Sequence, residues 1–312
     1  MTIPHCQPGL WPADIPEARF AAHIHVGLPV GCQIALLGLP DDTGVSLNSG
    51  RPGASEGPAA FRAALARYGV QHPAGWQWPK VFDAGDILPA KGHDELALRE
   101  THQRIFEATS ALLDLGLFPI AIGGGHDLTY PFVHAVARRN QPMTGVYFDA
   151  HLDVRAETGS GMPFRRLVED CGVRSLNVFG LSPLVNTREH TAWFETHGGQ
   201  IHGENTTGLA EPVLASLAEV LSGHTRPHHT VFASFDLDVL DAAHAPGVSA
   251  LNPAGWTLRE GAIAAELCGR SPWVRCFDIM ELNPRHDEQG RTARAAVCIF
   301  LSFLRGFAAR HH

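Results

Sequence analysis

The chain has 312 residues, of which 24 are basic and 32 are acidic, giving a net charge of −8 at pH 7. Hydrophobic residues make up 45% and charged residues 18%, which indicates a globular protein with a full core and excludes a disordered chain or a small disulfide scaffold. The acidic balance argues against nucleic-acid binding, and the sequence has no run of about 18 apolar residues that would cross a membrane.

Short apolar runs alternate with longer amphipathic stretches from about residue 32 onward. The predicted strands are residues 32–39, 81–84, 118–122, 145–149, 175–180, 230–236 and 274–279. The predicted helices are residues 57–68, 95–115, 211–221, 257–268 and 292–310. Most of these strands are apolar along their whole length, as expected when helices cover both faces of a parallel sheet. The sequence therefore predicts a three-layer α/β/α fold.

No linker, repeat or low-complexity segment divides this pattern. We expect a single domain over residues 1–312, with residues 1–31 as an N-terminal extension packed on it. The six cysteines are scattered without a Cys-x-x-Cys pair, and the first 20 residues lack an apolar run of signal-peptide length. The sequence therefore predicts free thiols and a cytoplasmic protein.

Clustered polar residues follow three of the predicted strands. Ligands bind beyond the carboxyl ends of the strands in open parallel sheets, so these residues are candidate ligands. They are His126 after the strand at 118–122, Asp149, His151 and Asp153 at the end of the next strand, and Asp236 and Asp238 at the end of the strand at 230–236. Because residues two apart in an extended chain project to the same side, we expect the six side chains to converge.

Four carboxylates gathered at one point repel each other unless cations neutralise them. With two imidazoles they suit a pair of divalent ions such as Mn²⁺, and the lack of cysteine among them disfavours structural zinc. A single aspartate at a strand end is more often a helix cap, whereas two such clusters in one chain favour a metal site. The glycines at 123–125 lack the Gly-Lys-Ser/Thr ending of a phosphate-binding loop.

Four segments resemble the signature segments of the ureohydrolase family of arginases and agmatinases: 124–127 (GGHD), 149–153 (DAHLD), 234–238 (SFDLD) and 281–284 (ELNP). The resemblance implies a three-layer α/β/α domain with a mainly parallel eight-stranded sheet, two Mn²⁺ per subunit and a homo-oligomer. The implied ligands are His126, Asp149, Asp153 and Asp236 for one ion, and Asp149, His151, Asp236 and Asp238 for the other. Glu281 corresponds to the family glutamate that pairs with the cationic amidine or guanidine of the substrate, and Asp153 is a candidate proton relay.

The segment at 159–166 bears on the substrate. Guanidine hydrolases of the family usually have a proton-shuttling histidine there, whereas Ser160 occupies that position in this chain. This segment, with those at 39–45 and 50–58, is similar to the formimidoylglutamases of histidine degradation. The resemblance thus implies a small-molecule substrate, N-formimidoyl-L-glutamate, which would be hydrolysed to L-glutamate and formamide.

That substrate carries two carboxylates and one amidinium, so its pocket should offer anionic groups at one end and arginine at the other. Arg155, two residues beyond Asp153, favours such an acidic substrate over the amine tail of agmatine. The further substrate-binding candidates are Arg51, Arg165, Asn48 and Ser160. A structural ion pair explains any one of the arginines equally well. Two other functions stay open: hydrolysis of agmatine or a guanidino acid with release of urea, and a non-catalytic scaffold stabilised by metal.

Overall fold

The computed structural model describes residues 3–69, 77–222 and 230–310. Its described residues form one ten-stranded sheet in the order β1-β4-β3-β5-β10-β9-β6-β7-β8, with β2 paired to β4. The strands are β1 (Cys6–Gln7), β2 (His25–Val26), β3 (Ile34–Leu39), β4 (Val81–Ile87), β5 (Phe118–Gly123), β6 (Met143–Phe148), β7 (Ser175–Leu181), β8 (Gly199–Glu204), β9 (Thr230–Asp236) and β10 (Val274–Met280). Neighbouring strands are parallel except β1 and β4.

The eight longer strands, β3 to β10, form the mainly parallel sheet that the sequence predicts. Seven of them overlap predicted strands. The eighth, β8, was not predicted because its sequence GQIHGE is largely polar, as an edge strand allows. The two-residue strands β1 and β2 come from the N-terminal extension and were not predicted either.

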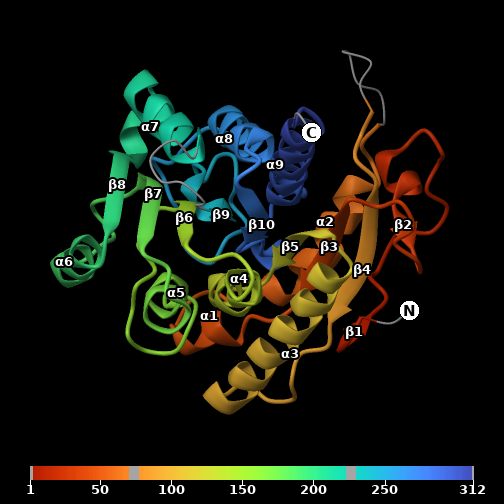
Figure 1. The fold of residues 1–312 in the computed structure, drawn as a ribbon, viewed down its shortest axis with the longest axis horizontal. Helices are drawn as coiled ribbons and strands as arrows, with labels where there is room; N and C mark the ends of the chain where they lie inside the picture. The colour runs from red at the N-terminus through yellow and green to blue at the C-terminus, as the bar shows by residue number, and fades with distance from the viewer. Residues whose placement is uncertain (1–2, 70–76, 223–229, 311–312) are drawn as a thin grey trace.

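Helices cover both faces of the sheet (Figure 1). They are α1 (Thr43–Leu47), α2 (Gly57–Leu65), α3 (Glu95–Asp114), α4 (Thr129–Ala137), α5 (Pro163–Cys171), α6 (Arg188–Thr196), α7 (Glu211–Ser222), α8 (Leu258–Arg270) and α9 (Arg291–Ala308). One core lies between the sheet and α2, α7, α8 and α9, and a second lies between the sheet and α3 to α6. The predicted three-layer fold is confirmed. In the part of the chain described here, no helix has both the length and the apolar character needed to span a membrane.

The side chains of β3 show why the strands are continuously apolar. Ile34 and Leu36 belong to the first core, whereas Ala35 and Leu37 belong to the second. All six residues of β3 are buried. A strand that is covered on both faces needs apolar residues at every position.

The described part of the N-terminal extension packs against β4 through a buried ion-pair cluster. Arg62 of α2, only 1% exposed, donates two hydrogen bonds to Asp83 at 2.9 Å each and one to Asp86 at 2.6 Å. Trp11 of the extension donates its indole N–H to Asp83 at 2.6 Å. Asp83 of β4 thus connects α2, through Arg62, with Trp11 of the N-terminal extension.

Candidate metal centre

The candidate ligands lie at the carboxyl ends of β5, β9 and β6, which sit with β10 at the centre of the sheet. After β5 the chain turns sharply at Gly124, where a Cβ would lie 1.9 Å from the carbonyl oxygen of Asp41. Only glycine fits this close approach. The turn delivers His126 to the first position of a short 3-10 helix, where it is 1% exposed.

The aspartates follow their strands by different routes. β6 ends at Phe148, and Asp149 comes next, fully buried. Asp153 has a φ of 47°, in the left-handed region, so the expected extended run from 149 to 153 is wrong even though its side chains still converge. Asp236 is the last residue of β9, and the backbone N–H of Asp238 donates to its Oδ1 at 2.8 Å.

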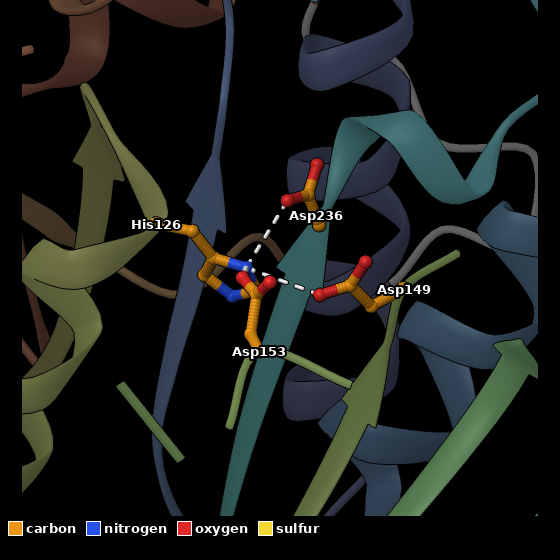
Figure 2. A group of neighbouring side chains, drawn as sticks. All are labelled: His126, Asp149, Asp153 and Asp236. Atoms are coloured by element: carbon orange, nitrogen blue, oxygen red, sulfur yellow. Dashed lines mark ion pairs between the residues drawn. The ribbon is translucent and has the colours of Figure 1, made fainter. Parts of the chain in front are cut away.

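Three carboxylates converge on the imidazole of His126 (Figure 2). Its Nδ1 lies 3.2 Å from Asp149 Oδ2, 3.0 Å from Asp153 Oδ2 and 3.1 Å from Asp236 Oδ2. These four side chains offer ligand atoms that all lie within 4.8 Å of one another. They are the four residues that the family resemblance assigns to one ion.

A second group adjoins the first. His151 Nδ1 lies 3.0 Å from Asp238 Oδ2 and 3.4 Å from Asp149 Oδ1. Asp149 therefore directs one oxygen to each group, as a bridging carboxylate would. Asp236, the other expected bridge, falls within the first group alone by the same distance criterion.

The donor set fits divalent cations. His126 Nδ1 and Asp149 Oδ2 are buried, and neither has a partner with hydrogen-bonding geometry among the described residues. Burial raises the pKa of Asp149 to about 6, and burial with the charge of Asp238 raises the pKa of Asp236. Such a concentration of buried carboxylates is stabilised when metal ions neutralise it, and two imidazoles with oxygen ligands suit Mn²⁺.

Two residues that were not predicted from the sequence, Ser234 and Asp278, orient His126. Its Nε2 lies 3.0 Å from Ser234 Oγ, and the Ser234 hydroxyl donates to Asp278 Oδ1 at 2.5 Å. Because the Ser234 hydroxyl donates to Asp278, its oxygen can accept from an Nε2–H of His126, and this arrangement leaves Nδ1 to face the carboxylates. Ser234 lies two residues before Asp236 and pairs with Asp278 in the sheet, but that pairing becomes visible only when β9 and β10 are known to be neighbours.

The Ser234→Ala variant should bind Mn²⁺ about 10- to 100-fold more weakly, because the imidazole loses the partner that fixes its orientation. Equilibrium dialysis against Mn²⁺ with elemental analysis measures the change. Ser216→Ala is the matched control, since among the described residues that hydroxyl donates only to the carbonyl oxygen of Pro212 in its own helix. Unchanged Mn²⁺ affinity in Ser234→Ala would remove this serine from the support of the site.

Glu281 follows β10 and is 2% exposed. Its φ of 67° is strained for a residue with a side chain, which is typical of functional sites. Its Oε1 accepts the backbone N–H of His126 at 2.9 Å, and its Oε2 is buried without a hydrogen-bond partner among the described residues. Burial raises the pKa of this carboxyl to about 7.

A cavity of about 130 Å³ opens onto this cluster. Its lining includes His151, Asp153, Asp236, Asp238 and Glu281, together with three of the predicted substrate-binding residues, Asn48, Arg155 and Ser160. The structure thus brings the Glu281 carboxylate, the Arg155 guanidinium and the candidate metal ligands around one small space.

The other two predicted substrate-binding residues are engaged elsewhere. Arg51 donates to the carbonyl oxygen of Ser249 at 3.2 Å and to that of Val248, so it holds a segment that forms part of the cavity wall. Arg165 lies 2.9 Å from Glu169 on the same helix, and its guanidinium sits 4.9 Å from the ring centre of Trp193. Neither arginine lines the cavity.

Comparison with known proteins places this site in a family. Residues 32–305 match the family model described as the arginase family. The chain belongs to the arginase family. The match covers every strand of the sheet from β3 to β10 and all the candidate ligands, so the resemblance that the sequence motifs predicted is confirmed.

Among its relatives in the arginase family is the formimidoylglutamase of Aromatoleum aromaticum, 35% identical over 295 residues that cover 89% of this chain and 84% of the relative. The formiminoglutamase of Trypanosoma cruzi, solved with Mn²⁺, has a TM-score of 0.83 and 31% identity, covering 94% of this chain and 99% of that one. The formimidoylglutamase of Bacillus subtilis has a TM-score of 0.84 and 27% identity, covering 94% and 93%. The relatives agree with the branch predicted from residues 159–166.

Proposed function

We propose that this protein is a formimidoylglutamase that uses two Mn²⁺ ions to hydrolyse N-formimidoyl-L-glutamate to L-glutamate and formamide. The observation that carries the proposal is the content of one cavity, in which Glu281 and Arg155 line the same space as the candidate metal ligands. An amidinium requires a carboxylate partner, and a substrate carboxylate requires a guanidinium. The relatives named formimidoylglutamase support the same substrate.

Two ligand sets would hold the ions. We assign His126, Asp149, Asp153 and Asp236 to one ion, and Asp149, His151 and Asp238 to the other, with Asp236 as the second proposed bridge. When bound, such a pair of divalent ions supplies Lewis acidity, which lowers the pKa of water and polarises the carbon that is attacked.

The protein's own side chains orient the substrate and move its protons. The unpartnered Oε2 of Glu281 pairs with the amidinium, while Oε1 stays fixed by the backbone of His126. This pairing places the formimidoyl carbon beside the metal ligands. Asp153, which lines the cavity, is positioned to relay a proton to the departing glutamate nitrogen as the C–N bond breaks.

A panel of substrates tests the proposal. Mn²⁺-loaded protein should release glutamate from formimidoylglutamate and should release no urea from arginine, agmatine or guanidinobutyrate. Release of urea at a comparable kcat/KM would instead establish a guanidine hydrolase. If protein shown to contain two Mn²⁺ hydrolysed none of these substrates, the alternative of a non-catalytic scaffold stabilised by metal would be favoured.

Replacing Arg155 by alanine should raise KM for formimidoylglutamate about tenfold or more while leaving the Mn²⁺ content unchanged, because a hydrogen bond between charged groups is lost. Arg165→Ala is the matched control, since that guanidinium pairs with Glu169 outside the cavity. Steady-state kinetics of both variants measure the difference. Equal KM values for Arg155→Ala and the unmodified protein would exclude Arg155 from substrate binding.

We also propose that residues 1–312 form one catalytic domain, active as a cytoplasmic homo-oligomer. Phe20, Ala21 and Ile24 of the N-terminal extension belong to the same core as α9, which supports a single domain. Free thiols at all six cysteines support a reducing compartment. Light scattering of the purified protein gives the oligomeric state directly, and a monomer at micromolar concentration would overturn that part.

A further inference from the structure

Asn48 lies where two parts of the cavity wall meet. It follows α1 directly, and its own backbone N–H donates to the carbonyl oxygen of Gly44 at 3.2 Å. Opposite it lies the loop of residues 155–161, which begins two residues after the candidate ligand Asp153 and carries Arg155. Asn48 and Arg155 line the same cavity.

The side-chain oxygen of Asn48 holds this loop. Asn48 Oδ1 accepts the backbone N–H of Gly161 at 2.8 Å and the Ser160 hydroxyl at 3.4 Å. The carbonyl oxygen of Gly161 in turn accepts the backbone N–H of Arg155 at 2.8 Å. Two consecutive hydrogen bonds therefore connect the Asn48 amide to the backbone of Arg155.

Glycines allow this close packing. A Cβ on Gly159 would lie 2.5 Å from the side-chain amide of Asn48, and a Cβ on Gly161 would lie 2.9 Å from Cδ of Arg155. The loop thus packs closely against Asn48 at Gly159 and against the side chain of its own Arg155 at Gly161. Its conformation and the position of the guanidinium are set together.

The nitrogen of the same amide is available to a ligand. Asn48 Nδ2 takes part in no hydrogen bond with the described residues, although Asn48 lines a cavity that already holds a guanidinium. A side-chain amide N–H₂ is a donor only, so the partner that it suits is an acceptor such as a carboxylate oxygen. The carboxylates that face this cavity from the protein are Asp153, Asp236, Asp238 and Glu281, four groups that the proposed function assigns to metal or amidinium.

We infer that Asn48 determines specificity for acidic amidines: Oδ1 positions the Arg155 loop, and Nδ2 donates to the substrate carboxylate that Arg155 binds. This inference rests on the proposed function. A cationic or alkyl substrate tail offers no acceptor to Nδ2 and Arg155, whereas a carboxylate satisfies both donors.

Asn48→Asp separates the two roles of the amide. Aspartate keeps an oxygen to accept from Gly161 and Ser160, but it replaces the Nδ2 donor by an anionic oxygen beside the incoming carboxylate. We expect KM for formimidoylglutamate to rise about 10- to 100-fold in Mn²⁺-loaded enzyme, with kcat within about threefold and two Mn²⁺ retained. Hydrolysis of an N-formimidoyl alkylamine without carboxylates should keep its kcat/KM, so the preference for the acidic substrate falls.

Ser49→Asp is the matched control. It adds the same charge at the adjacent exposed position, which does not line the cavity, and should change KM less than threefold. A KM within twofold of the unmodified enzyme in Asn48→Asp, or equal losses on the acidic and neutral substrates, would overturn the inference. Failure of the unmodified enzyme to hydrolyse formimidoylglutamate would overturn the proposed function instead, so the two failures are distinguishable.

Discussion

Replacing Asp149 by asparagine should lower kcat/KM by a factor of about 10³ or more, equivalent to about 4 kcal/mol. Asp149 is fully buried and directs one oxygen toward His126 and the other toward His151. The substitution removes the carboxylate shared by both ligand groups, so we expect the dimetal site to be lost. Kinetics at saturating Mn²⁺, combined with elemental analysis of the dialysed protein, measure both effects.

Asp114→Asn provides the control for the loss of one negative charge. Asp114 is exposed at the end of α3, pairs with Arg139 at 2.7 Å and belongs to neither candidate ligand group. It should keep two Mn²⁺ and full activity. If Asp149→Asn retained two Mn²⁺ and more than a tenth of the activity, the bridging role of Asp149 would be wrong.

Replacing Arg62 by alanine should lower the free energy of unfolding by about 3 to 5 kcal/mol. The side chains of Arg62 and Asp83 are each 1% exposed and that of Asp86 is 10% exposed, so the variant leaves two carboxylates in the interior without their cation. Burial already raises the pKa of Asp86, and Arg62 is the group that opposes this rise. The indole of Trp11 remains the smaller donor to Asp83.

Urea denaturation of the Mn²⁺-loaded protein measures this effect. Arg67→Ala is suitable as the control because Arg67 is exposed just beyond the end of α2. It should change the free energy of unfolding by less than about 0.5 kcal/mol. If Arg62→Ala lowered the free energy of unfolding by less than about 1 kcal/mol, the buried cluster would contribute little to stability.

The sequence was most informative where one local rule determined the structure. A strand covered on both faces must be apolar throughout, which revealed seven of the longer strands. Polar residues directly after such strands lie at the carboxyl edge of the sheet, which revealed the ligands. β8 was missed because an edge strand need not be apolar, and β1 and β2 because two-residue strands depend on β4 rather than on their own sequence.

Other features depend on which distant segments become neighbours. The support of His126 by Ser234 and Asp278 requires β9 to lie beside β10. The left-handed conformation of Asp153 could not be foreseen, because the alternation of an extended chain already explained its approach to the site. Sequence alone could not distinguish Arg155, which lines the cavity, from Arg51 and Arg165. Arg51 contacts Ser249 and Arg165 contacts Trp193, and both contacts join segments that are distant in the sequence.

Anomalous diffraction at the manganese absorption edge, from crystals of protein loaded with Mn²⁺, tests the central claim most directly. We predict two peaks in each chain, one beside His126 and the other beside His151, with Asp149 between them. A cleft with no peak, or a single peak away from these side chains, would contradict the dimetal site and the hydrolase function that depends on it.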